Sequence, residues 1–323
     1  TLLKSYNLSF QSIPAAGLHG VGLRALPGNL KQLYNGWHKA RGILAQFKPH
    51  ALFFTGGYLG VPVALAGRRI PSVVFIPDIE PGLALKTILR SAKKVAVSCE
   101  ESLRYVPSER TVVSGYPIRR ELIKWKRKQA RAHFGIPAKE SAVLIFGGSK
   151  GARSINRALF TCLPSLLKDM HIIHISGKDN WQEVNNLTET LSSKAKQRYH
   201  AYPFLHEDMG AAFAAADLAV CRAGASTLGE LPSFALPAVL VPYPHAWRYQ
   251  QQNAAHLERL GGAIILEDRL LESKLESQVR QLLNDPDQLD QMRKAMRTAA
   301  SPRAAERIAE LILTTGGERK GGA

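Results

Sequence analysis

Short runs of valine, isoleucine and other apolar residues alternate with helical patterns along almost the whole chain. This alternation is typical of βαβ units, in which helices connect parallel strands. We predict strands at residues 51–55, 73–76, 95–98, 111–114, 142–146, 172–176, 218–221, 238–241 and 263–266. We predict helices at residues 31–47, 151–168, 181–191, 227–234, 249–259, 272–284 and 302–313.

The strand series is interrupted between Pro117 and about Ala138, where a basic helix and a Gly-Ile-Pro turn intervene. A length of 323 residues fits two domains of about 150 residues each. We therefore predict an α/β fold with two Rossmann-like domains in tandem, at residues 1–131 and 132–323. Hydrophobic residues at 45% and charged residues at 21% exclude a disordered or collagen-like chain.

Positive charge is concentrated in the first of these domains. Residues 1–131 hold 21 Lys and Arg against 6 Asp and Glu, whereas residues 132–323 hold 22 against 20. Such an excess indicates an anionic partner, which could be nucleic acid, anionic lipid or a phosphorylated substrate. No nucleic-acid-binding motif accompanies the charge, and the charge is confined to one domain, so we expect no nucleic-acid partner.

The cysteines argue against a metal or redox site, and the glycines and prolines argue against a membrane-spanning helix. Cys99, Cys162 and Cys221 are odd in number and far apart, which favours reduced core thiols over a metal or redox site. The longest apolar stretches, at residues 50–67 and 231–247, are interrupted by glycine or proline. Neither supplies the roughly 20 apolar residues that a membrane-spanning helix needs.

The strongest chemical signal is FGGSKGARSIN at residues 146–156, where a predicted strand enters a glycine-rich turn that opens a helix. Glycines allow the backbone to approach a ligand, and the N–H groups of the first helical turn favour a diphosphate. The spacing matches neither the dinucleotide-binding pattern nor the P-loop pattern. The alternative is a strand-to-helix turn without a ligand.

A second segment, CRAGASTLGE at residues 221–230, also lies between a predicted strand and a helix. Its small residues leave room for a ring. Glu230 follows Thr227 by one helical turn, a position that suits the hydroxyls of a ribose. The alternative is a helix cap in which Ser226 or Thr227 pairs with Glu230.

A third segment, at residues 242–254, combines a proline-rich loop with a helix that carries Gln250 and Asn253 on one face. Neutral amides both donate and accept hydrogen bonds, so this pair suits sugar hydroxyls. The alternative is a polar, exposed helix start. In the first domain, residues 55–62 form another glycine loop, and Arg119 at the domain junction could bind a phosphate or form an interdomain salt bridge.

Together these segments resemble the MurG family of GT-B glycosyltransferases. The resemblance follows the family's order through residues 13–20, 56–58, 147–153 and 221–230 to Gln250 and Asn253. It implies two Rossmann-like domains facing across a cleft. The last helix could stay with the second domain or cross back to the first. It also implies transfer of GlcNAc from UDP-GlcNAc to undecaprenyl-pyrophosphoryl-MurNAc-pentapeptide, lipid I, giving lipid II for peptidoglycan.

The resemblance assigns a role to individual residues, position by position. Arg119 and Ser149 would contact the UDP phosphates, Leu205 would lie at the uracil, and Glu230 would hold the ribose. The remaining assignments are Ala225, Ser226 and Thr227 along the nucleotide, Gln250 and Asn253 at the transferred sugar, and Tyr58 and Asn156 at the acceptor.

Two departures from the family pattern bear on catalysis. No counterpart of the family's opening Gly-Gly-Thr-Gly-Gly-His loop precedes Ile13, and there is no initiator Met, so we expect a truncated first domain. The His of that missing loop is the family's usual base. The family's His-Glu-Gln-Asn acceptor segment is here residues 75–82, which also lack His, so Asp78 and Glu80 remain as candidate bases in this chain. The resemblance implies an inverting displacement in which the helix N-terminus and Arg119 stabilise the leaving diphosphate, so no metal or cofactor is expected.

Two alternative functions remain: a related transferase with another lipid acceptor, and a donor-binding but catalytically silent fragment. A lipid-linked acceptor implies peripheral attachment to the anionic surface at the cytoplasmic face of the cell membrane. The candidate apolar stripe is Leu23, Leu26, Leu30, Leu33 and Trp37, and the basic residues near it are Arg24, Lys31, Lys39 and Arg41. The alternative is that this stripe packs on its own domain.

Overall fold

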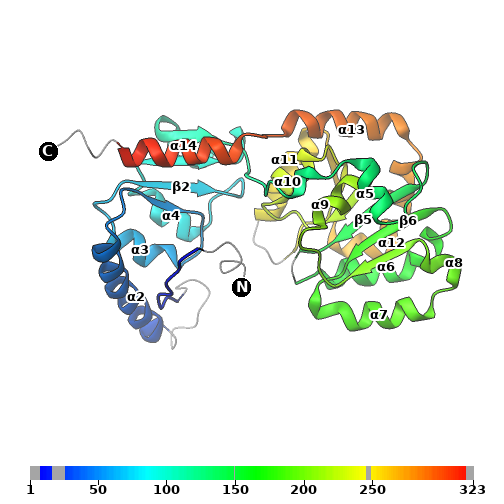
Figure 1. The fold of residues 1–323 in the computed structure, drawn as a ribbon, viewed down its shortest axis with the longest axis horizontal. Helices are drawn as coiled ribbons and strands as arrows, with labels where there is room; N and C mark the ends of the chain where they lie inside the picture. Colours follow the sequence, from blue (N-terminus) through cyan, green and yellow to red (C-terminus); the bar gives the residue numbers. More distant parts are fainter. Residues whose placement is uncertain (1–7, 17–25, 149, 245–248, 318–323) are drawn as a thin grey trace. The chain divides into compact units, whose positions relative to one another are not determined.

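The computed structural model of the chain describes residues 8–16, 26–148, 150–244 and 249–317. It divides into two compact units (Figure 1), of which the first comprises residues 1–114 with 306–323 and the second comprises residues 115–305. Each unit is built on a parallel sheet. The alternation of strand and helix patterns predicted this, so the α/β prediction is confirmed.

The first unit contains a four-stranded sheet in the order β1-β2-β3-β4. Its strands are β1 (Leu52–Phe54), β2 (Ser72–Ile76), β3 (Lys94–Val97) and β4 (Thr111–Val113), and the helices that accompany them are α2 (Leu26–Phe47), α3 (Gly60–Ala66) and α4 (Leu83–Leu89). Strand β2 is buried along its whole length, and Val74 and Ile76 pack with Ile88 of α4. Such continuous burial is typical of a parallel strand covered on both faces.

The last helix, α14 (Ala304–Gly317), belongs to the first unit from Glu306 onward. Within that unit, Arg307 Nη1 donates to the carbonyl oxygen of Ser114 at 3.3 Å. Gly316 lies beside His50 and Ala51 at the start of β1. The end of the chain therefore completes a unit that the first part of the chain begins.

The second unit contains a six-stranded parallel sheet in the order β10-β9-β8-β5-β6-β7. The strands are β5 (Ser141–Phe146), β6 (Met170–Ile175), β7 (Tyr199–Tyr202), β8 (Leu218–Cys221), β9 (Ala238–Leu240) and β10 (Ala263–Ile265). The helices are α5 (Arg127–His133), α6 (Arg153–Leu166), α7 (Trp181–Thr190), α8 (Ser193–Lys196), α9 (Met209–Ala215), α10 (Thr227–Ser233), α11 (Tyr249–Arg259), α12 (Leu271–Leu283) and α13 (Pro286–Ala299).

The strand order of this sheet reverses at β5. Strands β6 and β7 follow on one side of β5, and β8, β9 and β10 follow on the other. In open parallel sheets the carboxyl ends of the strands diverge at such a switch point and leave a crevice for a ligand. The glycine-rich turn predicted to bind a ligand starts where β5 ends.

The core of the second unit lies between this sheet and its helices. Val143 and Ile145 of β5 pack with Ile155 and Leu159 of α6 and with Val279 of α12, and all five side chains are completely buried. Full burial of each such side chain contributes roughly 1.5–3 kcal/mol. The apolar face of α6 therefore fixes this helix, and with it the turn that precedes it.

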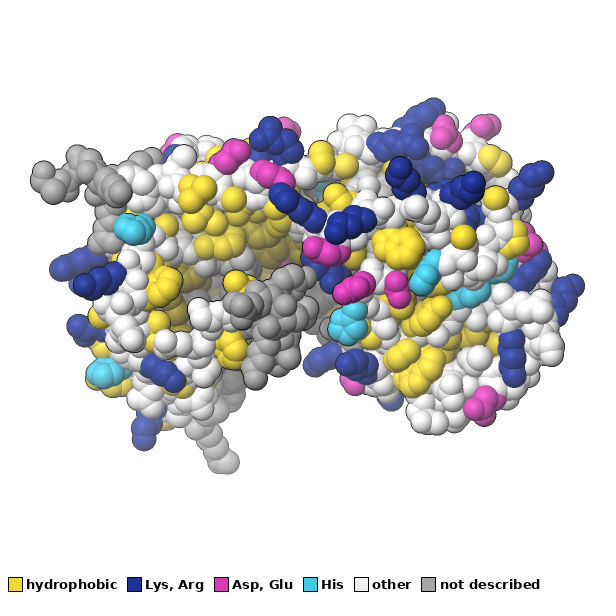
Figure 2. Space-filling view, in the orientation of Figure 1, with side chains coloured by type: hydrophobic (Ala, Val, Ile, Leu, Met, Phe, Trp, Pro, Cys, Tyr) yellow, Lys and Arg dark blue, Asp and Glu magenta, His cyan; other side chains and the backbone are white. Residues whose placement is uncertain are grey.

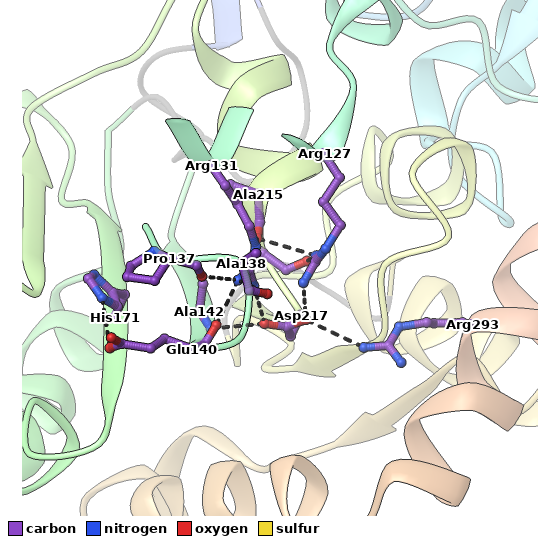
Figure 3. A network of polar contacts seen from close by, with 11 residues as sticks. Arg127, Arg131, Pro137, Ala138, Glu140, Ala142, His171, Ala215, Asp217 and Arg293 are labelled. Carbon is purple, nitrogen blue, oxygen red and sulfur yellow. Dashed lines mark hydrogen bonds and ion pairs between the residues drawn. The ribbon is translucent and has the colours of Figure 1, made fainter. Parts of the chain in front are cut away.

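A network of hydrogen bonds and ion pairs around Asp217 explains why the second unit begins before residue 131 (Figure 3). Arg131, only 4% exposed, donates to Asp217 Oδ2 at 2.7 Å and to the carbonyl oxygens of Ala215 and Pro137. Arg127 donates to Asp217 Oδ1 at 2.6 Å. The predicted boundary at residue 131 put the basic helix in the first domain, yet two of its arginines bind within the second unit.

Two general features concern the described residues only. No helix among them combines the length and the apolar character needed to cross a bilayer. No three His, Cys, Asp or Glu side chains gather into a potential metal site within the same ranges.

Candidate functional site

The carboxyl ends of the second sheet open onto a cavity of about 880 Å³ within the second unit. The turn after β5, the start of α6, Arg222 after β8 and Gln250 of α11 all line it. The remaining lining residues are Tyr243, Pro244, Asp268, Arg269, Leu271 and Glu272. Segments far apart in the sequence therefore meet at the switch point, where a ligand is expected.

The turn between β5 and α6 has a shape that only glycine permits at two positions. A Cβ atom on Gly151 would lie 1.9 Å from the carbonyl oxygen of Ser176, and the residue adopts φ +81°. A Cβ atom on Gly147 would lie 2.2 Å from the backbone nitrogen of Ala152. Ser149, the predicted phosphate contact in this turn, lies outside the described residues.

The start of α6 suits an anion. Its N-cap residue, Ala152, provides no side-chain hydrogen bond to the free N–H groups of the first turn. Three cationic side chains, Lys150, Arg153 and Arg157, line the cavity beside them. Cations at a helix N-terminus are unfavourable because they oppose the helix dipole, and Arg153 and Arg157, four residues apart, repel each other. A bound anion would offset both repulsions.

Arg222 connects three other segments at the cavity wall: the start of α6, the loop after β9 and the segment at Asp268. Its guanidinium donates to Ser154 Oγ at 2.6 Å, to the carbonyl oxygen of Val241 at 3.2 Å and to the carboxylate of Asp268, and lies 5.2 Å from the ring centre of Tyr243. Ser154 in turn donates to Asp268 at 2.8 Å. Sequence reasoning assigned no role to Arg222, although an arginine directly after a buried strand was a usable signal.

Glu230 lies near Arg119 in the second unit. A Cβ atom on Gly229 would lie 2.8 Å from the ring of Tyr116, so the glycine lets the segment before Arg119 approach α10. Burial raises the pKa of the Glu230 carboxyl, while a hydrogen bond from Ser226 and the charge of Arg119 act in the opposite direction. The Ser226 side chain does not cap the backbone of α10.

The neighbouring positions of this loop differ in accessibility. Ala225 and Ser226 are half-buried, whereas Thr227 is 2% exposed and donates its hydroxyl to the carbonyl oxygen of Gly224 at 2.6 Å. Thr227 therefore shapes the loop. Leu205, expected at a uracil, is 9% exposed and follows β7 at the same end of the sheet.

Gln250 and Asn253 do not share one environment, although both are on α11. Gln250 lines the cavity, and its Oε1 accepts a hydrogen bond from the backbone of Tyr243 at 2.9 Å. Asn253 is completely buried and donates to the carbonyl oxygen of Ala223 at 3.0 Å. The alternative prediction was a polar, exposed helix start without a ligand. Asn253 does not fit that alternative, because it is buried and supports the loop after β8.

Asn156 was expected at the acceptor, and the structure puts it in the core. It is 1% exposed, its Nδ2 donates to the carbonyl oxygen of Ser176 at 3.0 Å, and its Oδ1 is 3.1 Å from His174 Nε2. The sequence was misleading because this asparagine lies on the sheet-facing side of α6, beside Ile155 and Leu159.

The first unit holds the other predicted acceptor residues. Tyr58 is 50% exposed in the glycine loop after β1. Glu80 is 2% exposed and pairs with Lys86 Nζ at 3.0 Å, whereas Asp78 is half-buried. The glycine loop also borders a cavity of about 840 Å³, which Phe10, Phe47 and Phe54 line with other residues of this unit.

The apolar stripe proposed for membrane contact lies on α2. Leu23 is outside the described residues, and the side chain of Leu26 is not described. Leu30 is 53% exposed, whereas Leu33 and Trp37 are half-buried. Tyr34, which the sequence analysis did not select, is 62% exposed and lies 5.9 Å from the ring of Trp37, over which Arg41 is positioned.

Comparison with known proteins agrees with this arrangement. Residues 1–97 match the glycosyltransferase family 28 N-terminal domain, and residues 142–308 match the family 28 C-terminal domain. A protein from Roseiflexus sp. (strain RS-1), named UDP-N-acetylglucosamine–N-acetylmuramyl-(pentapeptide) pyrophosphoryl-undecaprenol N-acetylglucosamine transferase, is 38% identical over 95% of this chain and 79% of its own. A protein of the same name from Desulforudis audaxviator is 36% identical over 96% and 86%.

Among solved structures, MurG from Acinetobacter baumannii resembles this fold with a TM-score of 0.72 and 27% sequence identity. The match covers 97% of this chain and 87% of that one. It therefore includes both units.

Proposed function

Because the chain belongs to the MurG family within glycosyltransferase family 28, we propose that it transfers N-acetylglucosamine from UDP-N-acetylglucosamine to undecaprenyl-pyrophosphoryl-N-acetylmuramyl-pentapeptide. The product is lipid II, a precursor of peptidoglycan. The observation that supports this most directly is the cationic cavity of the second unit, where the glycine-rich turn, Arg222 and Gln250 meet. Its size and its few convergent polar groups suit a sugar joined to a diphosphate.

The diphosphate is the leaving group, and it gains negative charge as its bond to the sugar breaks. We assign it to the start of α6, where free N–H groups and the cations Lys150, Arg153 and Arg157 are arranged in advance. Arg119 and Ser149 are further proposed contacts. Groups that stabilise the developing charge without rearranging lower the barrier of the chemical step.

The nucleoside and the sugar are assigned to the loops on either side of this turn. Glu230 accepts hydrogen bonds from the ribose hydroxyls, and the backbone near Leu205 contacts the uracil. Ala225 and Ser226 border the nucleotide. Gln250 binds the transferred sugar, since it lines the cavity, whereas Asn253 fixes the loop after β8 from behind.

On the acceptor side, the attacking hydroxyl must lose a proton as it displaces UDP with inversion. We propose Asp78 as the base in this chain, because Glu80 is buried in an ion pair with Lys86 and Asp78 is more accessible. Asp78→Asn should then lower kcat more than Glu80→Gln does. Tyr58, exposed in its glycine loop, is the proposed acceptor contact in the first unit.

We also propose that the protein attaches peripherally to the cytoplasmic face of the membrane, because its acceptor is lipid-linked. The support is α2, which carries the exposed side chains of Leu30 and Tyr34 and the basic residues Lys31, Lys39 and Arg41. Apolar insertion combined with basic charge gives the two signals that stable peripheral attachment requires.

The function is tested first by titration calorimetry of the whole chain with UDP. Glu230→Ala should raise the Kd about 10- to 100-fold, because it removes charge-assisted hydrogen bonds worth roughly 1.5–3 kcal/mol. Glu183→Ala, which removes an exposed carboxylate from α7, serves as the control and should leave the Kd unchanged. Equal binding by the parent and the Glu230 variant would contradict the ribose assignment.

Transfer of labelled GlcNAc is then measured with lipid I and, separately, with diacylglycerol. Lipid I should be the preferred acceptor. Preference for diacylglycerol would support the related glycolipid transferase instead, and UDP binding without transfer to either lipid would support a catalytically silent chain.

A further inference from the structure

A row of buried polar side chains runs beneath the glycine-rich turn of the second unit. Tyr199 of β7, His174 of β6 and Asn156 of α6 are 5%, 0% and 1% exposed. The Tyr199 hydroxyl lies 2.7 Å from His174 Nδ1, and His174 Nε2 lies 3.1 Å from Asn156 Oδ1. Asn156 Nδ2 donates to the carbonyl oxygen of Ser176 at 3.0 Å.

The hydrogen bonds of this row have one consistent direction. Burial lowers the pKa of His174 to about 3, so its ring is neutral near pH 7 and carries a single N–H. Asn156 Oδ1 can only accept, so that N–H is on Nε2 of His174. Nδ1 must then accept the proton of the Tyr199 hydroxyl. Every donor in the row therefore points toward the carbonyl of Ser176.

The carbonyl of Ser176 is in direct contact with the turn. It lies 1.9 Å from where a Cβ atom on Gly151 would be, and it also accepts from Asn180 Nδ2 at 3.3 Å. The same Nδ2 group of Asn180 donates to the carbonyl oxygen of Lys150 at 3.3 Å. Asn180, 8% exposed, therefore joins the end of the buried row to the turn itself.

The peptide group between Lys150 and Gly151 is consequently held at both ends. Its carbonyl accepts from Asn180, and its N–H donates to the carbonyl oxygen of Gly148 at 2.9 Å. Peptide groups next to glycine can rotate easily, because glycine tolerates either sign of φ. A rotation here would break both hydrogen bonds and turn the Lys150 carbonyl oxygen away from Asn180.

We propose that Asn180 is a positioning residue for the donor diphosphate, and that the buried row from Tyr199 to Asn156 fixes the Ser176 carbonyl against which Asn180 is oriented. The inference rests on the proposed function, since it assumes that UDP occupies the start of α6. Asn180 does not touch the nucleotide. It acts by keeping the carbonyl of Lys150 directed away from the phosphates.

The test compares UDP with uridine as ligands of the whole chain. Asn180→Ala should weaken UDP binding about 3- to 10-fold, which corresponds to one lost hydrogen bond. It should leave uridine binding, measured by competition, unchanged, because uridine has no phosphate. Asn185→Ala is the matched control: it makes the same chemical change at an exposed site of α7, where the amide bonds Glu189.

A milder variant removes the possibility that Asn180→Ala acts only through misfolding. Tyr199→Phe keeps the ring and removes the hydroxyl that donates to Nδ1 of His174. Asn156 still accepts from Nε2, so the N–H of His174 should stay on Nε2, while the ¹⁵N resonance of Nδ1 should shift because Nδ1 loses its hydrogen bond. UDP binding should weaken less than it does in Asn180→Ala. An N–H found on Nδ1 of His174 in the parent chain would overturn the assigned hydrogen-bond direction.

The outcomes separate the two proposals. If the parent chain does not bind UDP, the proposed function fails. If the parent binds UDP and Asn180→Ala binds it equally well, only the positioning role fails. If Asn180→Ala weakens UDP and uridine equally, the residue has a general structural role and the inference is wrong.

Discussion

The second unit is marked by internally paired charged side chains, and the first by exposed large apolar side chains. In the second unit, Asp217 and Arg222 find their partners inside the protein. In the first unit, large apolar side chains are exposed: Phe47 is 76%, Tyr34 is 62% and Leu65 is 58% exposed. Figure 2 shows hydrophobic side chains on the visible faces of both units.

This difference matches the two substrates that we propose. A nucleotide sugar is recognised by polar groups fixed in advance, and internal hydrogen bonds provide that rigidity. A lipid-linked acceptor at a membrane requires apolar and basic groups at the surface instead. If the comparison holds, substitutions in the second unit should affect stability and donor binding, and substitutions on α2 should affect membrane attachment alone.

The largest effect is expected at Asp217. Asp217→Ala would leave buried Arg131 without its carboxylate partner and would also remove the acceptor of the Ala142 N–H. Breaking such a buried pair typically costs about 3–5 kcal/mol. Calorimetric unfolding should show the transition of the second unit at a clearly lower temperature.

The control for this variant is Asp169→Ala. Asp169 is 56% exposed and pairs with Arg280 at 2.6 Å, so its loss should cost no more than about 1 kcal/mol. Equal destabilisation by both variants would mean that burial of the Asp217 network adds nothing to its strength.

The next largest effect is expected at Gly151. Gly151→Ala would place a methyl group against the Ser176 carbonyl at a φ of +81°, so the turn must deform. We expect donor affinity to fall on the order of a hundredfold, about 3 kcal/mol. Gly148→Ala is the matched control: its φ is +88°, but nothing lies within 4 Å of the added methyl group, so only the smaller cost of the left-handed conformation, about 1–2 kcal/mol, applies.

Much of the fold could be predicted from the sequence, because buried parallel strands are continuous apolar runs. Strand β7 was missed, since its sequence Tyr-His-Ala-Tyr is at the sheet edge and lacks that signal. Helix α13 was also missed, although Asp285 caps it through the backbone of Gln288. Cys162 and Cys221 are buried, as predicted for core thiols, whereas Cys99 is half-buried.

The site was predicted less completely, because accessibility depends on which face of a helix a residue occupies. Gln250 lines the cavity, but Asn253, three residues later, is buried. Arg222 and Asn180 were not identified, since their importance depends on contacts with residues 46 and 30 positions away. The position of Arg222 directly after β8 was the one local signal, and the partners themselves leave no local pattern in the sequence.

A smaller effect is expected for one charge on α2. Lys39→Gln should weaken binding to vesicles that contain anionic lipid about fivefold, because each basic residue near such a surface contributes about 1 kcal/mol. Added salt should reduce the difference. Thermal stability should not change, since Lys39 is exposed.

Lys294→Gln provides the comparison in the second unit. It removes the same charge from a side chain that is 69% exposed, and vesicle sedimentation should not detect the change. If both variants weaken binding equally, the net charge of the protein rather than the surface of α2 drives attachment. Membrane attachment would then not distinguish the first unit from the second.

The smallest effect is expected at Glu230, which is an exception within the second unit because burial raises the pKa of its carboxyl. A carboxyl whose pKa is higher in the folded than in the unfolded state binds more protons when folded. The free energy of unfolding therefore falls as the pH rises through the interval between the two pKa values. Glu230→Gln removes this penalty and should raise Tm at pH 7.5 by a small amount. At pH 4, where most of the wild-type carboxyl is already protonated, the gain should nearly vanish.

The same variant should bind UDP more weakly, since an amide replaces the carboxylate at the ribose. A variant that is less stable at pH 7.5 would show that the hydrogen bond from Ser226 and the charge of Arg119 outweigh burial, and Glu230 would then be no exception to the internal pairing of the second unit.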